Sequence, residues 1–145
     1  MEFRLIALTA LFVLVAGCAA GDRSMMATRP YPHSHSFYDL LVSWETTGNR
    51  GSVTIDGTLK NQSYYYLSDP EITATLLDAN GKIIGEGTFL FFPHQFSLDE
   101  IAPFTIRIPL KEGEVPKRIR FTYRYRLAEE GMAGSLRFNS FEATP

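Results

Sequence analysis

The chain has 145 residues and a formal charge of −2, from 14 lysines and arginines against 16 aspartates and glutamates. A balance this close to neutral argues against a general nucleic-acid-binding protein, because such domains are usually strongly basic. The length fits a single domain, and an aromatic content of 13%, mostly Phe and Tyr, favours strands over helices.

The first segment has the parts of a secretory signal peptide. A short polar start containing Arg4 precedes an apolar stretch over residues 5–16, which is shorter than the ~20 residues of a transmembrane helix. Cys18, the only cysteine, directly follows Val15-Ala16-Gly17. This arrangement resembles the lipobox of a bacterial lipoprotein. The alternative is a plain secretory signal or an uncleaved anchor.

The lipobox resemblance implies that residues 1–17 are a cleaved signal peptide and that lipid, including palmitate, is attached to Cys18. The lipid would anchor the chain to a membrane, and it would consume the only thiol, so we expect a folded domain without a disulfide. Ala19 stands where an aspartate would resemble an inner-membrane retention signal. Its identity favours the outer membrane, facing the periplasm, if the host is Gram-negative.

We predict that residues 18–36 form the lipidated N-terminus and a flexible tether, and that the folded domain occupies residues 37–145. The tether segment mixes polar and small residues, contains Pro30 and Pro32, and lacks periodicity. A linker of this kind lets a lipid-anchored domain stand away from the bilayer.

From residue 37 onward, apolar side chains alternate with polar ones, which is typical of half-buried strands. In chain order, we expect strands at residues 37–45, 52–60, 72–77, 82–92, 104–108, 118–127 and 135–141, with loops at residues 61–70 and 93–102. Gly85 and Gly87 indicate a bulge or a close approach of another backbone. The pattern predicts an all-β fold, an Ig-like antiparallel β-sandwich of about seven strands, with a small barrel as the alternative.

Part of the domain resembles a known family. Residues 57–63 read Gly-Thr-Leu-Lys-Asn-Gln-Ser, similar to the G-x-V-x-N-x-S strand end of FxLYD-type domains, which are themselves similar to the WHy group of Ig-like sandwiches. Residues 72–84 resemble the hydrophobic strand, D-x-x-G turn and return strand of that family. The chain departs from the pattern at Thr75-Leu76-Leu77 and at residues 98–101. The resemblance implies a non-enzymatic module and carries over no catalytic residue.

Few residues suggest catalysis or metal binding. His33 and His35, with Asp39 and the distant His94, supply only part of a zinc ligand set. The histidine pair lies in the expected tether, where no second shell would orient it. Adjacent carboxylates at residues 99–100 and 129–130 would point to opposite faces of an extended strand. We therefore expect no enzyme, no bound metal and no cofactor.

The most distinctive feature of the expected domain is a row of arginines on one strand. The row is Arg118, Arg120, Arg124 and Arg126, whose shared parity places them on one face, opposite the core-facing set Ile119, Phe121, Tyr123, Tyr125 and Leu127. We favour a solvated outer face with cross-strand partners among Glu71, Glu45 and Glu142. The alternative is a surface for an anionic partner such as lipid phosphates, an acidic polymer or an acidic protein patch.

Aromatic residues supply the second candidate surface. Tyr64, Tyr65 and Tyr66 fall in an expected loop, where side chains have little core to fill, so they either fold back onto the sandwich edge or contact a partner. The phenylalanines at 89, 91 and 92 are expected to be mainly core. An uncovered Phe91 or Phe92 would instead mark a partner surface.

These features lead to two hypotheses. In the first, the chain is a membrane-anchored envelope lipoprotein, a non-catalytic interaction or structural module that binds an envelope protein or an anionic envelope component. In the second, it is a lipoprotein that binds a small ligand or glycan through Tyr64, Tyr65, Tyr66 and the 93–102 loop. A hydrolase comes third, because it would need a deep cleft with converging carboxylates or histidine.

Overall fold

The computed structural model describes residues 30–49, 51–92, 94–128 and 134–145. Within these ranges the chain forms strands only, and no helix that could cross a membrane is present. The strands are β1 (His33–Phe37), β2 (Leu40–Asn49), β3 (Ser52–Asn61), β4 (Tyr66–Leu77), β5 (Ile83–Leu90), β6 (Gln95–Phe96), β7 (Ile101–Pro109), β8 (Arg118–Ala128) and β9 (Ser135–Ala143). The expected signal peptide and Cys18 lie outside the described residues.

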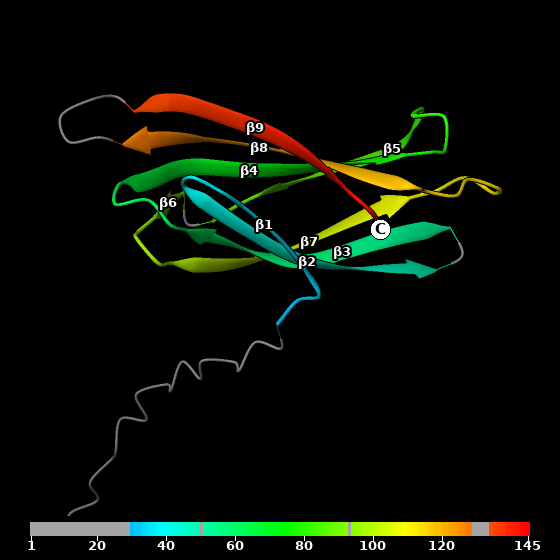
Figure 1. Cartoon of the computed structure of the whole chain (residues 1–145), viewed down its shortest axis with the longest axis horizontal. Helices are drawn as coiled ribbons and strands as arrows, with labels where there is room; N and C mark the ends of the chain where they lie inside the picture. The colour runs from blue at the N-terminus through cyan, green and yellow to red at the C-terminus, as the bar shows by residue number, and fades with distance from the viewer. Residues whose placement is uncertain (1–29, 50, 93, 129–133) are drawn as a thin grey trace, which may run out of the picture.

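The strands form two antiparallel sheets that face each other (Figure 1). One sheet has the order β1-β2-β3-β7, and the other has the order β5-β4-β8-β9, with the short β6 also paired to β4. Two separate sheets confirm the predicted Ig-like β-sandwich rather than the barrel. The two strands beyond the expected seven are β1 and β6.

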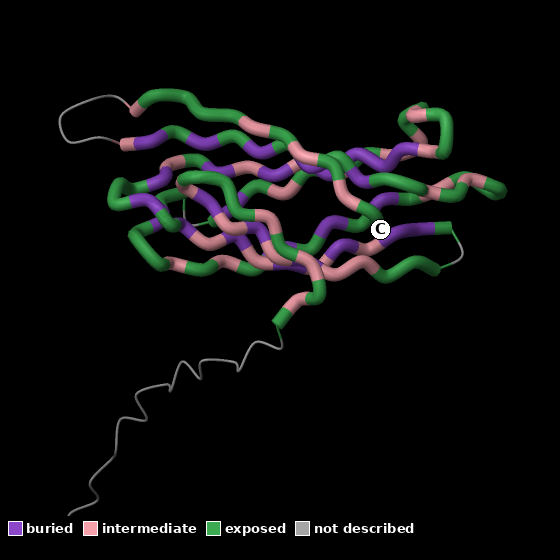
Figure 2. Tube along the Cα trace, in the orientation of Figure 1, coloured by how far each residue is buried: buried purple, intermediate pink, exposed green. Residues whose placement is uncertain are grey.

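Alternation along the strands places one face of each sheet in the core. In β8, Ile119, Phe121, Tyr123, Tyr125 and Leu127 are buried, and the residues between them are exposed (Figure 2). Burying each large apolar side chain stabilises the fold by roughly 1.5–3 kcal/mol. This shared apolar layer therefore joins the two sheets.

The domain begins earlier than residue 37, so the predicted end of the tether is wrong. Strand β1 occupies His33–Phe37 and pairs with β2. Its inward rings are histidines: His33 stacks on Trp44, and His35 stacks on Phe141 of β9 with ring centroids 3.9 Å apart. Alternation of apolar residues did not reveal this strand, because imidazole rings take the place of aliphatic side chains.

The expected loop at residues 61–70 is mostly strand. Strand β3 continues to Asn61 and β4 begins at Tyr66, so the connection is only residues 62–65. Pro70 argues against a central strand because it lacks a ladder donor. The structure accommodates it in a bulge, since the β4–β8 register shifts between Ser68 and Glu71.

Three glycines allow close contact between backbone and side chains. A Cβ on Gly57 would lie 2.4 Å from the Ser43 carbonyl oxygen and 2.5 Å from the Phe104 ring. A Cβ on Gly85 or Gly87 would lie 2.6 Å from an isoleucine methyl group of β7 in the facing sheet. The groups that approach Gly85 and Gly87 most closely are therefore isoleucine side chains rather than another backbone. The β4–β5 register shifts between Leu76 and Leu77, which places the predicted bulge beside Gly85.

Candidate functional site

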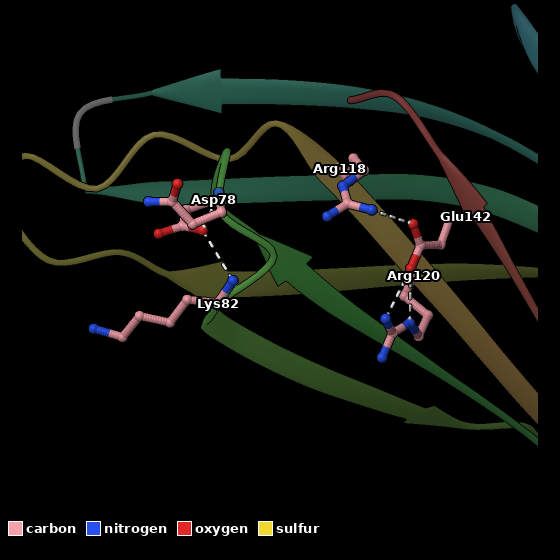
Figure 3. A network of polar contacts seen from close by, with 6 residues as sticks. Asp78, Lys82, Arg118, Arg120 and Glu142 are labelled. Atoms are coloured by element: carbon pink, nitrogen blue, oxygen red, sulfur yellow. Dashed lines mark hydrogen bonds and ion pairs between the residues drawn. The ribbon is translucent and has the colours of Figure 1, made fainter.

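The outer face of the β5-β4-β8-β9 sheet carries the predicted arginine row, and the structure divides that row into two halves. In the first half, Arg118 Nη1 and Arg120 Nη2 each lie 2.8 Å from the Glu142 carboxylate (Figure 3). The hydrogen bonds from Arg120, together with the Arg118 charge, hold the pKa of Glu142 below its ordinary value. The two arginines of this half therefore share one carboxylate of the neighbouring strand, a partner that the sequence suggested.

The second half combines arginine with exposed apolar side chains. Arg124 Nη2 lies 2.7 Å from Glu71 Oε2, whereas Arg126 forms no ion pair among the described residues. Directly opposite these arginines on β9 lie Phe138 and Leu136, which are 78% and 57% exposed. The suggested pairing of the row with Glu45 is wrong, because Glu45 lies on β2, which belongs to the other sheet.

A groove of about 370 Å³ crosses this second half. Its lining residues are Asp69, Pro70, Glu71, Leu90, Phe91, His94, Arg124, Tyr125, Arg126 and Leu136. We name five exposed side chains on this part of the sheet the β8–β9 patch: Leu90, Arg124, Arg126 and Leu136, which line the groove, and Phe138, which lies opposite Arg124. The patch joins two positive side chains to three apolar ones that have little contact with the core.

Asn61 organises the connection that carries the three tyrosines. Its side chain is fully buried, and Nδ2 donates to the carbonyl oxygens of Tyr65 and Phe96 at 3.0 and 3.1 Å. Its Oδ1 accepts a hydrogen bond from Ser63 N at 2.7 Å. The buried amide thus ties the connection to the start of β4 and to β6, which explains an asparagine at the end of this strand.

The three tyrosines project away from the core. Tyr64 is 91% exposed, and Tyr65 and Tyr66 are about half exposed. Two further exposed rings, Phe37 and Tyr38, lie at the adjacent β1–β2 turn, where Gln62 N donates to Asp39 O at 2.7 Å. We name these five residues the aromatic end, which is at the left of Figure 1.

Sequence reasoning missed part of this surface. Alternation placed Tyr38 on the same face as Leu40 and Val42, but Tyr38 belongs to the tight β1–β2 turn and has a φ of 24°. Asp39 was the one available turn signal, because aspartate favours turns. Phe92 is 71% exposed, and an uncovered phenylalanine at this position is what the sequence analysis took as the mark of a partner surface. Its ring centroid lies 4.4 Å from that of His94, which lines the groove.

A hydrogen bond joins the two sheets near the aromatic end. Tyr125 of β8 donates its hydroxyl to Asp39 Oδ2 at 2.6 Å. Burial, and then this bond to a carboxylate, raise the pKa of the Tyr125 phenol well above its ordinary value. The bond fixes the β1–β2 turn against the opposite sheet.

The histidines do not converge on a common site. His33 and His35 stack on aromatic rings, while His94 Nδ1 lies 3.4 Å from Asp69 Oδ1. Among the residues that the structure describes, no group of three or more His, Cys, Asp or Glu side chains is placed to hold a metal ion.

The adjacent carboxylates at residues 99–100 also have structural contacts: Asp99 pairs with Lys60, and Glu100 accepts a hydrogen bond from Ser97 N. The pair at residues 129–130 lies outside the described residues.

Comparison with known proteins identifies no family: no family model matches the chain, and no curated protein does. Among solved structures, the chain is similar to the GAE domain of yeast GGA1, with a TM-score of 0.49 and 10% identity over 78% of this chain and 97% of that one. It is also similar to part of a β-glucuronidase of glycoside hydrolase family 2, with a TM-score of 0.40 and 7% identity. That match covers 68% of this chain and 11% of the enzyme. Neither similarity carries an inference about activity.

Proposed function

We propose that this chain is a membrane-anchored envelope lipoprotein whose β-sandwich is a non-catalytic interaction module. Lipid on Cys18 would hold it at the outer membrane, on the periplasmic side of a Gram-negative cell. The sandwich would bind an envelope protein or an anionic envelope component. The anchoring part of the proposal is supported by the apolar stretch that ends in Val15-Ala16-Gly17-Cys18.

The binding part is carried by one observation: Phe138 is 78% exposed on a strand, directly opposite Arg124. A solvated outer face gains nothing from a phenylalanine, while aromatic residues and arginine are enriched in the buried centres of protein interfaces. Leu90 and Leu136 are each more than half exposed and border the same groove. The β8–β9 patch therefore has the composition of a binding surface, and Arg126 adds a positive charge suited to an acidic partner.

The alternative function is binding of a small ligand or glycan through the tyrosines and the 93–102 loop. Small-ligand sites are usually concave and surround most of the ligand. Tyr64, Tyr65 and Tyr66 do not line the groove described above, and of the described residues of the 93–102 loop only His94 lines it. The groove therefore favours the interaction module over this alternative.

Site-specific crosslinking in cells tests the binding part. A photoreactive amino acid at residue 138 should capture a defined product, and the same group at Val115, which is 58% exposed near the other end of the sandwich, is the matched control. Phe138→Ser combined with Arg126→Glu should abolish a product captured from Leu136 without lowering the unfolding midpoint. Identical products from residues 138 and 115, or a product indifferent to the double substitution, would contradict the assignment.

Labelling with palmitate tests the anchoring part. The wild-type chain should incorporate the label and sediment with membranes, while Cys18→Ser should do neither. Membrane association that survives this substitution would refute lipid anchoring through Cys18.

A further inference from the structure

We infer that the aromatic end is a membrane-docking surface, which rests against the headgroup region of the bilayer that holds the lipid anchor. This inference rests on the proposed anchoring at Cys18 and adds a second contact with the same membrane. It concerns a surface separate from the β8–β9 patch.

The rings of the aromatic end are held out from the fold by ordered backbone. Tyr64 and Tyr38 are 91% and 86% exposed, so their rings contribute little to the stability of the domain. The buried Asn61 amide fixes one of the two segments, and the Asp39–Tyr125 hydrogen bond fixes the other. Aromatic side chains kept in water by a rigid scaffold are positioned for contact with something outside the domain.

The two ends of the sandwich differ in the side chains that they expose. At the opposite end, the exposed large apolar residues are Ile83 and Val115, and no described residue of the turns there is aromatic. Those turns carry charged side chains of both signs, including Lys82, Lys111 and Glu112. Tyrosine concentrates at membrane interfaces because its ring is apolar and its hydroxyl remains hydrated. Among the described turns of the two ends, only those of the aromatic end have this composition.

The described carboxylates at the aromatic end have partners within the domain. Asp99 Oδ1 lies 2.7 Å from Lys60 Nζ, and Asp39 accepts the Tyr125 hydroxyl. Glu100 accepts the backbone N–H of Ser97 at 2.8 Å. The described carboxylates beside the rings thus already have partners, which reduces the cost of bringing this end to a lipid surface.

The chain between anchor and domain is long enough for both contacts. Residues 19–32 separate Cys18 from the start of β1 and can span about 50 Å when fully extended. From His33, β1 runs toward the aromatic end over five residues, or about 17 Å. The lipid and the aromatic end can therefore meet the same bilayer. The rings project from two connections, and none of the five lines the groove of the β8–β9 patch. This geometry favours a flat lipid surface over an enclosed ligand.

Lipid-borne quenching tests the inference. The full lipidated chain is reconstituted in vesicles of phosphatidylethanolamine and phosphatidylglycerol that carry a nitroxide quencher on the lipid. Tyr64→Trp is compared with the matched reporter Val115→Trp, and buried Trp44 supplies a constant background. We expect the added emission of Tyr64→Trp to be quenched and that of Val115→Trp to persist. Adding Tyr38→Ser and Tyr65→Ser should reduce the quenching at residue 64.

Each other outcome overturns the inference in a distinguishable way. If the chain floats with the vesicles but the two reporters are quenched equally or not at all, anchoring stands and docking fails. If the chain does not float with the vesicles, the anchoring itself fails. If residue 64 escapes lipid quenching in vesicles but is shielded from aqueous iodide in isolated envelopes, a protein covers this end instead of the bilayer.

Discussion

Replacing Asn61 with alanine should weaken the domain far more than one polar side chain usually does. The substitution removes an amide that is fully buried and that forms three hydrogen bonds, two donated to the carbonyl oxygens of Tyr65 and Phe96 and one accepted from Ser63 N. Alanine leaves these three backbone groups without their partner, in positions that water does not readily reach.

The expected loss follows from the number of groups left unpaired. A buried donor or acceptor that loses its partner costs about 1–3 kcal/mol. Two of the three bonds are buried and one is partly buried, so we expect the free energy of unfolding to fall by roughly 3–5 kcal/mol. Because a whole domain is stable by about 5–15 kcal/mol, this loss should be large in a denaturant titration.

Urea unfolding of the wild type and the variant, followed by intrinsic fluorescence, measures this difference. The neighbour Gln62→Ala is the matched control, because the Gln62 side chain is exposed and accepts only the Ser36 hydroxyl. We expect that control to change the unfolding free energy by less than about 0.5 kcal/mol. A loss below about 1 kcal/mol for Asn61→Ala would refute the role of Asn61 as the organising residue of the tyrosine connection.

Three further predictions concern packing, charge and the contact between sheets. Gly57→Ala should destabilise the domain by at least about 1–3 kcal/mol in urea, because its Cβ would overlap a backbone oxygen, whereas Gly48→Ala, with nothing within 4 Å of the new Cβ, should be nearly neutral. Glu142 should titrate below 4.5 by NMR, because its pKa is lowered by the two arginines. Its contribution to stability is therefore complete above the unfolded-state pKa and is lost as the pH falls through the folded-state pKa. A titration midpoint at or above 4.5 would contradict the arginine network. Tyr125→Phe should lower the free energy of unfolding by about 1–3 kcal/mol, and after Asp39→Asn the same substitution should lower it by less. Equal losses in both backgrounds would mean that the hydroxyl–carboxylate bond contributes nothing to stability. In alkaline absorbance titration, removing Tyr125 should delete a tyrosine that ionises above the ordinary range of a phenol, because burial and the bond to Asp39 raise its pKa.

The sequence predicted the elements whose patterns are local. Strand β8 alternates without interruption, so both its buried face and its arginine face followed from parity alone. Strand β3 starts at Ser52, as expected, and ends at Asn61, one residue beyond its expected end. In both strands, each side chain's environment is set by its own position in the pleat, and this is information that a single segment contains.

Features that depend on distant partners were not predictable. The arginine row could not be divided from the sequence, because pairing of Arg120 with Glu142 and of Arg124 with Glu71 requires the registers of three strands. Phe138 became a candidate binding residue only because it lies opposite Arg124 on the neighbouring strand, and this pairing depends on the β8–β9 register. Strand β1 was not predicted for a similar reason, since its half-buried histidines stack on rings that belong to β2 and β9. The assignment of Cys18 stays a prediction from sequence.

Strand β1 also decides how mechanical tension would reach the domain. Under the proposed anchoring, a pull between bilayer and sandwich enters at His33, the end of β1 farthest from its turn into β2. The pairs from His33 to Phe37 are then loaded one after another, which resists force less than loading them together. Peeling β1 away would lengthen the linker by about 17 Å and would leave β2 to β9 paired. The first strand can thus act as an extensible element that yields before the core bears the load.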